Sequence, residues 1–158
     1  MKEEEILREH LVELLASRNA HASFEAAVKD VPARLRGVTP RGLPYSPWQL
    51  LEHIRIAQWD ILQFSRNPKH VSPSWPEGYW PKQAAPPSAA AWSRSVRQVR
   101  ADLTSMARLA KSSQNNLFRK IPHGGGQTLL REILLVADHN AYHVGQLVLL
   151  RRLLDAWK

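Results

Sequence analysis

The stretch QTLLREILLVADHNAYHVGQLVLLRRLLDAW, from Gln127 to Trp157, decides the fold class of this chain. It contains no proline, and its apolar residues recur at intervals of three and four, which is the period of an α-helix. These residues are Leu130, Ile133, Leu134, Ala137, Ala141, Val144, Leu147, Val148 and Leu154. A helix of about 30 residues, at 1.5 Å per residue, is about 45 Å long, which suits a full-length helical bundle.

The prolines separate this stretch from three other helix candidates. A proline inside a helix removes a hydrogen bond and clashes with the preceding turn, so helices are expected where proline is absent. Of the eleven prolines, four fall in 32–47, six in 68–87 and one at 122. The proline-free stretches, each long enough for a helix of several turns, are 1–31, 48–67, 88–121 and 123–158.

The other three stretches also carry apolar residues at helical spacing. The first contains, with interruptions at Arg18 and Glu25, the residues Leu7, Leu11, Leu14, His21 and Val28. The second contains Leu50, Leu51, Ile54, Ala57, Ile61 and Leu62, and the third contains Trp92, Val96, Val99, Leu103, Met106 and Ala110. Ser46, Pro47 and Gln49 form a start signal for the second helix, because serine caps, proline suits the first helical position and glutamine reaches back.

Four amphipathic helices, with no alternating strand pattern beside them, predict an all-α four-helix bundle. The length of 158 residues and a hydrophobic content of 44% fit one domain, 1–158, with a sizeable core. The connections at 32–45 and 67–87 are too long for tight turns, and such loops are usually functional or cross over the bundle. Residues 84–91, rich in alanine and proline, are expected to form a linker into the third helix.

The composition excludes several kinds of protein and of site. The chain has no cysteine, which excludes disulfides, thiolate metal sites and a cysteine nucleophile. Its longest run of large aliphatic residues, 133–136, is far shorter than the ~20 residues that span a membrane. The N-terminal residues 1–5 are too acidic for a signal peptide. We therefore expect a cytoplasmic protein with no membrane partner.

The charge balance raises the question of a nucleic-acid partner. Twenty-two Lys and Arg against fourteen Asp and Glu give a net charge of +8, and such a surface attracts polyanions. The basic residues are scattered through every segment, however, and the densest pair is Arg151 and Arg152. Because no basic arm is present, a solvated basic surface is preferred, and no specific nucleic-acid partner is expected.

Three of the seven histidines form a candidate metal site. His139 and His143 stand four residues apart on the fourth helix, so both imidazoles project from one face, as in other helical metal motifs. With seven histidines, chance also produces such spacings, so the pair by itself is a hypothesis. His53 lies in the second helix, and bundles build metal sites from facing helices. Taken alone, His53 is more simply interpreted as a half-buried histidine without a ligand role.

Three segments resemble the DinB/YfiT-like family of metalloenzymes. They are GGGQTLLRE (124–132), DHNAYHVGQL (138–147) and SPWQLLEH (46–53), and the resemblance extends over nearly the whole chain, including the loop at 73–81. It implies an up-down-down-up four-helix bundle, often dimeric, that holds one divalent metal ion with three histidines. By position these are His53, His139 and His143.

Other residues near these histidines have weaker interpretations. Asp60, two turns after His53, is the first choice for a carboxylate that accepts an imidazole N–H, whereas Glu52 and Asp138 are expected on solvated faces. Gly145 lies inside a predicted helix, where glycine is about 1 kcal/mol less stable than alanine. Close approach of another helix or of a substrate would explain a glycine at this position. The alternative is a glycine that is tolerated without a role. His21 is expected in the core or at its rim, in preference to the alternative of a fourth metal ligand. No role is assigned to His10, His70 and His123.

Three neutral imidazoles leave a metal open coordination positions and are typical of a catalytic site. The resemblance implies a hydrolase or a low-molecular-weight-thiol transferase, with a small-molecule substrate and a thiol as partners. The alternative is a metal-binding stress-response protein without catalysis. Imidazole ligands suit zinc and nickel as well as copper and iron, and we expect zinc or nickel at His53, His139 and His143.

Two further predictions concern the loop at 72–81 and the C-terminal residues. Trp75, Tyr79 or Trp80 is predicted to line the entrance to the metal pocket as an apolar wall. The alternative is a loop that only covers the end of the bundle. The apolar character of 153–157, together with the resemblance, predicts a homodimer.

Overall fold

The computed structural model describes residues 2–16 and 20–157 and is all-helical over that part of the chain. Its helices are α1 (Glu3–Ala16), α2 (Phe24–Val28), α3 (Pro47–Arg66), α4 (Ala89–Lys111) and α5 (Leu129–Leu153), with 3-10 turns η1 (Ala33–Leu35) and η2 (Glu77–Tyr79). Extended pairing in these residues is limited to one isolated bridge between Lys120 and Thr128. The predicted all-α class is confirmed. None of the described helices is long and apolar enough to cross a membrane.

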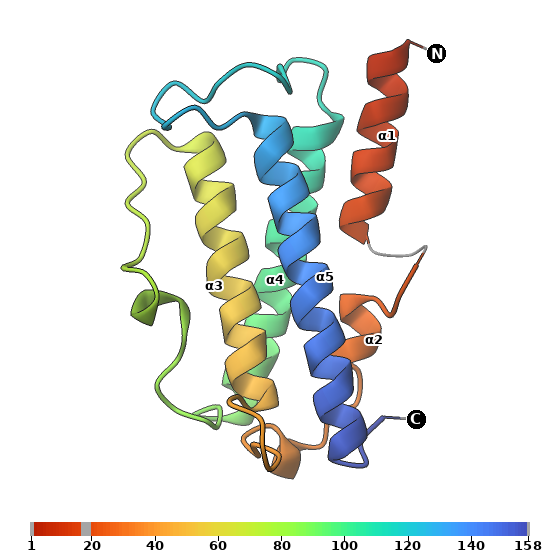
Figure 1. Ribbon diagram of the computed structural model, residues 1–158, viewed down its shortest axis with the longest axis vertical. Helices are drawn as coiled ribbons and strands as arrows, with labels where there is room; N and C mark the ends of the chain where they lie inside the picture. Colours follow the sequence, from red (N-terminus) through yellow and green to blue (C-terminus); the bar gives the residue numbers. More distant parts are fainter. Residues whose placement is uncertain (1, 17–19, 158) are drawn as a thin grey trace.

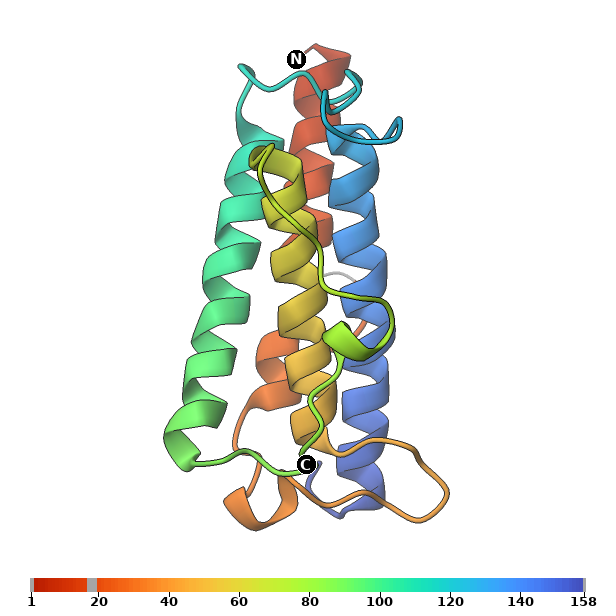
Figure 2. The ribbon, with the colours of Figure 1, turned by 90° about the vertical axis from the view of Figure 1, so that its left-hand side faces the viewer.

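The helices form the predicted up-down-down-up bundle (Figure 1). In that view α1 and α2 lead down the bundle, α3 and α4 both run upward, and α5 runs down to the C-terminus. Because α3 and α4 are parallel, the segment 67–88 must return the chain from the top of the bundle to its base. Figure 2 shows this crossover segment descending along the outside of α3, where η2 contacts that helix. The long loop therefore runs beside the helix that carries His53.

The prediction of one helix in the stretch 1–31 is wrong, because two helices, α1 and α2, form there. α1 ends at Ala16, and α2 begins after Ser23, whose hydroxyl accepts a hydrogen bond from the Ala26 amide. Of the predicted apolar face, His21 and Leu14 are exposed, so the expected core or rim position of His21 is corrected. The interruption at Arg18 lies outside the described residues.

The helix predicted in the stretch 88–121 is too long at its C-terminal end. α4 ends at Lys111, and the chain then folds over the end of the bundle, where Leu117 and Ile121 are buried. The start signal of the second helix is correct. The Ser46 hydroxyl accepts from the Gln49 amide, and the Gln49 side chain accepts from the Ser46 amide. The Ser46 hydroxyl also donates to the Ala84 carbonyl at 2.5 Å, which fixes the end of the crossover segment beside the start of α3.

The core of the bundle consists of two apolar clusters placed one above the other. Along α3 the first cluster includes Ile54 and the second begins at Ile61. Along α5 the second cluster ends at Ala137 and the first resumes at Val144. Between these positions both helices carry buried polar residues, among them Gln58 and Asn140. A polar layer therefore separates the two apolar clusters at the level of the histidines.

Arg8 ties α1 to the end of α4. Its guanidinium is buried and donates to the carbonyls of Ala110 at 2.7 Å, Ser112 at 2.8 Å and Asn115 at 2.5 Å. The Glu4 carboxylate, 2.6 Å away, balances the charge. The carbonyls at the end of a helix have no partner within the helix, so this side chain satisfies the Ala110 carbonyl that α4 leaves open, together with two carbonyls of the segment that follows.

Arg8→Met is expected to lower the free energy of unfolding by about 2–4 kcal/mol. Methionine keeps much of the volume but leaves one buried carbonyl and two partly buried carbonyls without this donor, and each loss of a buried partner costs about 1–3 kcal/mol. Urea denaturation followed by circular dichroism measures the change. The matched control is Arg97→Met on the exposed face of α4, which is expected to change stability by less than about 0.5 kcal/mol. Equal effects of the two substitutions would contradict this role of Arg8.

Candidate metal centre

His53 of α3 meets His139 and His143 of α5 at one point on the side of the bundle. One ring nitrogen from each lies within 4.8 Å of the others. The Nε2 atoms of His53 and His139 are 3.1 Å apart, and the His143 ring centre is 4.5 Å from each of the other two ring centres. Among the described residues this is the one group of three or more such side chains that could hold a metal ion.

Two of the three rings are held by hydrogen bonds from Nδ1. His53 Nδ1 lies 2.9 Å from the Tyr79 carbonyl, which only accepts, so this nitrogen carries the proton. His143 Nδ1 lies 2.7 Å from the Gln146 side-chain oxygen, one helical turn further along α5. In a neutral imidazole a protonated Nδ1 leaves Nε2 with a free lone pair. His53 and His143 therefore present bare Nε2 atoms.

The donor set fits a first-row divalent ion. Nitrogens about 2.0–2.1 Å from one tetrahedral ion lie about 3.4 Å from one another, close to the 3.1 Å between His53 and His139. Lone pairs at that distance repel unless a proton or a cation lies between them. Imidazole ligands suit zinc, nickel, copper and iron. The three histidines could therefore hold one metal ion.

All three rings are neutral at physiological pH, as metal ligands must be. Burial lowers the pKa of His53 to about 4, although the hydrogen bond to the Tyr79 carbonyl acts in the opposite direction. Burial, followed by the charge of His143, lowers the pKa of His139 to about 4. Burial also lowers the pKa of His143. A cation that enters the site thus meets little competition from protons near neutral pH.

The metal-free protein is expected to lose stability as the pH falls below about 6.5. In the unfolded chain histidine titrates near 6.5, whereas in the folded protein His53 and His139 titrate near 4. Between these two pH values the unfolded chain binds more protons than the folded protein does. The free energy of unfolding therefore decreases as the pH is lowered, by up to about 1.4 kcal/mol per pH unit for each histidine. Urea denaturation in the presence of a chelator measures the slope.

The double variant His53→Gln, His139→Gln is the comparison for this slope, since carboxylates also titrate as the pH falls. Its stability is expected to depend less on pH between about 6.5 and 4 than that of the wild type. The same slope in both proteins would show that these histidines are not held neutral by the fold.

Trp80 covers one face of the His53 imidazole. The two rings are stacked with centroids 3.8 Å apart at 4°, and Tyr45 stacks with Trp80 at 3.9 Å and 11°. Tyr79 supplies its carbonyl to His53, while Trp75 is 75% exposed and touches Tyr79 rather than the histidines. That one of these residues lines an entrance stays a prediction, but the crossover segment clearly forms one wall of the histidine cluster.

Asp60 does not accept from the candidate ligands, so that expectation is corrected. Its two carboxylate oxygens accept from His70 Nε2 at 2.6 Å and from the Tyr79 hydroxyl at 2.7 Å. Two helical turns are about 10 Å along the axis, which is too far for direct contact with His53. Burial, followed by the hydrogen bond to Asp60, raises the pKa of Tyr79 to about 12. Asp60 therefore anchors the segment whose Tyr79 carbonyl holds His53.

Other polar residues also differ from expectation. Glu52 is buried and paired with Arg55 at 2.8 Å, whereas Asp138 is exposed as predicted. A Cβ added to Gly145 would meet no atom of the described residues within 4 Å, so none of the other described helices packs closely against it. His70 has a structural role that sequence reasoning missed, and its loop position offered no signal.

The remaining histidines lie apart from the cluster. His10 is exposed near Glu13, His21 Nδ1 lies 3.0 Å from the neighbouring Ala22 carbonyl, and His123 donates to the Phe64 carbonyl. Gln146 was also missed, although its position three residues after His143 on a helix could have indicated a contact.

The fold and the site define a four-helix bundle with three converging histidines between two of its helices. The family model described as the DinB superfamily matches residues 16–147, and the chain belongs to that superfamily. The match covers both segments that carry the histidines. No curated protein and no solved structure matches this chain.

Proposed function

We propose that this chain is a metal-dependent enzyme that holds one divalent ion through Nε2 of His53, His139 and His143. The observation that carries the proposal is the convergence of three imidazoles, two of which are held so that their bare nitrogens face the same point. When bound, an ion with three neutral ligands keeps its charge and an open position, so it activates water or a thiol and polarises a substrate oxygen.

The surrounding residues support a small-molecule substrate. Trp80 keeps water from one face of His53, and Gln146 holds His143. A recess of about 60 Å³ lies beside them, lined mainly by apolar side chains, which include Leu43, Tyr45, Leu50 and Leu149. None of the three histidines is among the residues that line it, so the recess offers room for a short alkyl group of a substrate and does not set the size of the whole substrate.

The site is compatible with both reactions that the family suggests, hydrolysis and thiol transfer. Among the described residues no carboxylate belongs to the histidine group, and Asp60 is fully engaged with His70 and Tyr79. A free thiol has a pKa near 8.5 and free water one of 15.7, but an ion with three histidine ligands lowers the pKa of bound water to about 7. Charge from an ion held by imidazoles is therefore enough to activate either a thiol or water without a general base.

Metal analysis of protein purified without an affinity tag tests the proposal, followed by assays for transfer of low-molecular-weight thiols and for hydrolysis. We expect about one divalent ion per chain, zinc or nickel, and turnover in one of the two assays, thiol transfer or hydrolysis, that stops with a chelator and returns with the ion. Metal at this stoichiometry without turnover would support the alternative, a non-catalytic metal-binding protein. Protein that takes up no divalent ion would overturn both.

Trp80→Ala is expected to raise the KM for substrate about tenfold and to speed metal release to a chelator, because the stacked cover of His53 is lost. Steady-state kinetics and competition with a chromophoric chelator measure the two effects. Trp75→Ala, at an exposed position of the same segment, is the control. If both substitutions lower stability and neither changes ligand affinity, the segment only covers the bundle.

Homodimerisation stays a prediction. Leu149 and Leu153 of α5 are about half exposed, and they lie four residues apart on one face of the helix. Trp157, in contrast, lies beneath the Arg151 guanidinium, 4.9 Å from its ring centre. A second copy would therefore meet the face of α5 rather than the tryptophan at its end.

A further inference from the structure

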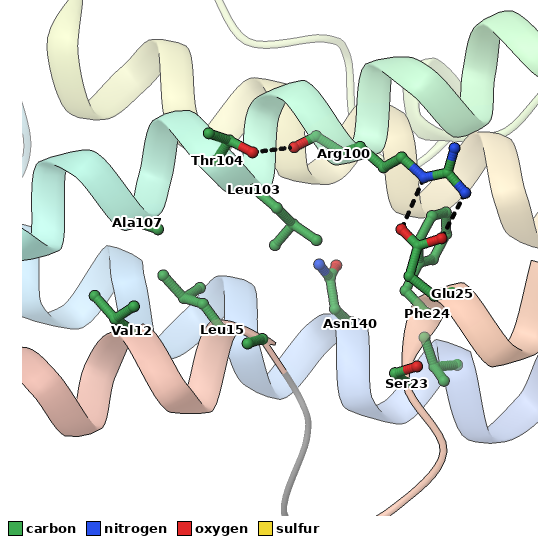
Figure 3. Close-up of a pocket in the computed structure, with 12 residues that line it drawn as sticks. Val12, Leu15, Ser23, Phe24, Glu25, Arg100, Leu103, Thr104, Ala107 and Asn140 are labelled. Carbon is green, nitrogen blue, oxygen red and sulfur yellow. Dashed lines mark hydrogen bonds and ion pairs between the residues drawn. The ribbon is translucent and has the colours of Figure 1, made fainter.

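One side of α5 points away from the rest of the bundle along most of the helix. Its exposed residues follow one another at intervals of three and four, so they form a single stripe. They are Leu134, Asp138, Tyr142, Gly145, Leu149 and Arg152. The buried side points the other way, because Asn140, 7% exposed, is directed toward Leu103 of α4 (Figure 3). Asp138 and Tyr142 are each two residues, or about 200° of helical turn, from Asn140 and therefore point outward.

The stripe is more apolar than contact with water alone requires. Leu134 is 43% exposed, Tyr142 64% and Leu149 49%. Single exposed apolar side chains are ordinary on a protein surface, whereas several of them along one helix form a surface that a partner typically covers.

Gly145 lies in the middle of the stripe. Inside a helix glycine is less stable than alanine, and contacts within the chain do not require it here, since an added Cβ would meet no atom of the described residues within 4 Å. Without a side chain, however, this position lets another backbone approach α5 closely. The middle of the stripe is therefore the point where a second helix fits best.

The charges of the stripe are arranged so that it complements a copy of itself. Asp138 lies seven residues before Gly145 and Arg152 seven residues after it. Both side chains are exposed, and neither has an ion-pair partner among the described residues. Two copies of α5 that run in the same direction would place acid against acid and base against base. Two antiparallel copies that cross at Gly145 place Asp138 of each beside Arg152 of the other.

The same antiparallel crossing also matches the apolar residues. Tyr142 lies three residues before Gly145 and Leu149 four residues after it, so Tyr142 of each copy meets Leu149 of the other. A two-fold axis through the crossing produces this arrangement, and two-fold symmetric dimers are the commonest oligomers of soluble proteins.

We propose that this protein forms a two-fold symmetric dimer in which α5 crosses α5 of a second copy at Gly145 in antiparallel order, with Tyr142 of each copy against Leu149 of the other. Leu149 lines the recess beside Gln146, and the Tyr142 ring lies 4.9 Å from the His143 ring of its own chain. Each copy therefore closes the recess of the other with a tyrosine. Only this closure of a substrate recess rests on the proposed function.

Sedimentation equilibrium of the metal-free protein at micromolar concentration tests the dimer. We expect the wild type at twice its chain mass of 18.0 kDa. Gly145→Glu is expected at the mass of one chain with unchanged circular dichroism, because the added side chain has free space in one chain but none where two helices cross. The control is Ala101→Glu, which introduces the same side chain at an exposed position in the middle of α4 and should stay dimeric. A wild type at 18.0 kDa, or a Gly145→Glu variant that dimerises as the wild type does, would overturn the inference.

Charge reversal tests the antiparallel order. Asp138→Arg and Arg152→Asp each place like charges opposite one another at both ends of the interface, so each alone should raise the dissociation constant of the dimer at least about tenfold. An equimolar mixture of the two variants should instead form a heterodimer close to the wild type in stability, because every base then meets an acid. A mixture that forms no heterodimer would contradict the antiparallel order.

Introduced cysteines test the position of the crossing, because the chain contains none of its own. A mixture of Tyr142→Cys with Leu149→Cys should form an intermolecular disulfide under mild oxidation, since this bond needs Cα atoms within about 7 Å. Tyr142→Cys alone should not, because its two copies lie about 10 Å apart along the helices. Equal cross-linking of the mixture and of Tyr142→Cys alone would show that the helices cross elsewhere. All three measurements use metal-free protein, so their outcome is separate from that of the proposed function.

Discussion

His139→Ala and His143→Ala are each expected to lose stoichiometric metal and all metal-dependent activity while the helical content stays near that of the wild type. Loss of a direct ligand should weaken affinity by more than about 100-fold, since even the loss of a ligand's hydrogen-bond partner costs 10–100-fold. The helices survive because their apolar faces pack in two clusters that do not include the histidines. Metal analysis and circular dichroism measure the two effects.

His10→Ala is the control, because this exposed histidine of α1 lies far along the chain from the cluster. It should retain full metal content. If His53→Ala, His139→Ala and His143→Ala all kept one ion per chain, the metal would lie elsewhere and the enzyme proposal would lose its chemical foundation.

Asp60→Ala is expected to lower the free energy of unfolding by about 2–4 kcal/mol and zinc affinity by about tenfold. The substitution leaves the buried His70 ring and the Tyr79 hydroxyl without their acceptor, and unpaired buried groups carry costs of this size. Affinity falls because the Tyr79 carbonyl, no longer held in place, also holds His53 Nδ1. Urea denaturation and chelator competition give the two values.

Glu77→Ala is the matched control, because Glu77 is exposed in the same crossover segment, within η2. It should change neither stability nor zinc affinity appreciably. A large loss of stability in Asp60→Ala with unchanged zinc affinity would show that the segment stabilises the bundle without holding His53.

The three histidines could be chosen before the structure because their pattern is local or belongs to a family. His139 and His143 lie one turn apart on a helix, and the helical period alone brings them together. His53 required the resemblance, since nothing in the spacing of 53 and 139 states that their helices meet. The segment 72–81 was predicted to lie at the metal pocket, but its specific contacts, the stacking of Trp80 and the bond to the Tyr79 carbonyl, could not be predicted because the segment has no periodic pattern.

The sequence by itself determined helices α3 and α5, the capping of α3 and the ligand pair on α5, because these depend on residues within a few positions of one another. Tertiary structure alone decided that Asp60 binds His70 and Tyr79, that Glu52 is buried, and that Gln58 and Asn140 meet. These contacts depend on the path of the crossover segment and on how three helices face one another. The pattern of residues along the sequence indicates neither the path of that segment nor the facing of the helices. A polar residue on an apolar face gives the same pattern whether it bonds to water or to another helix.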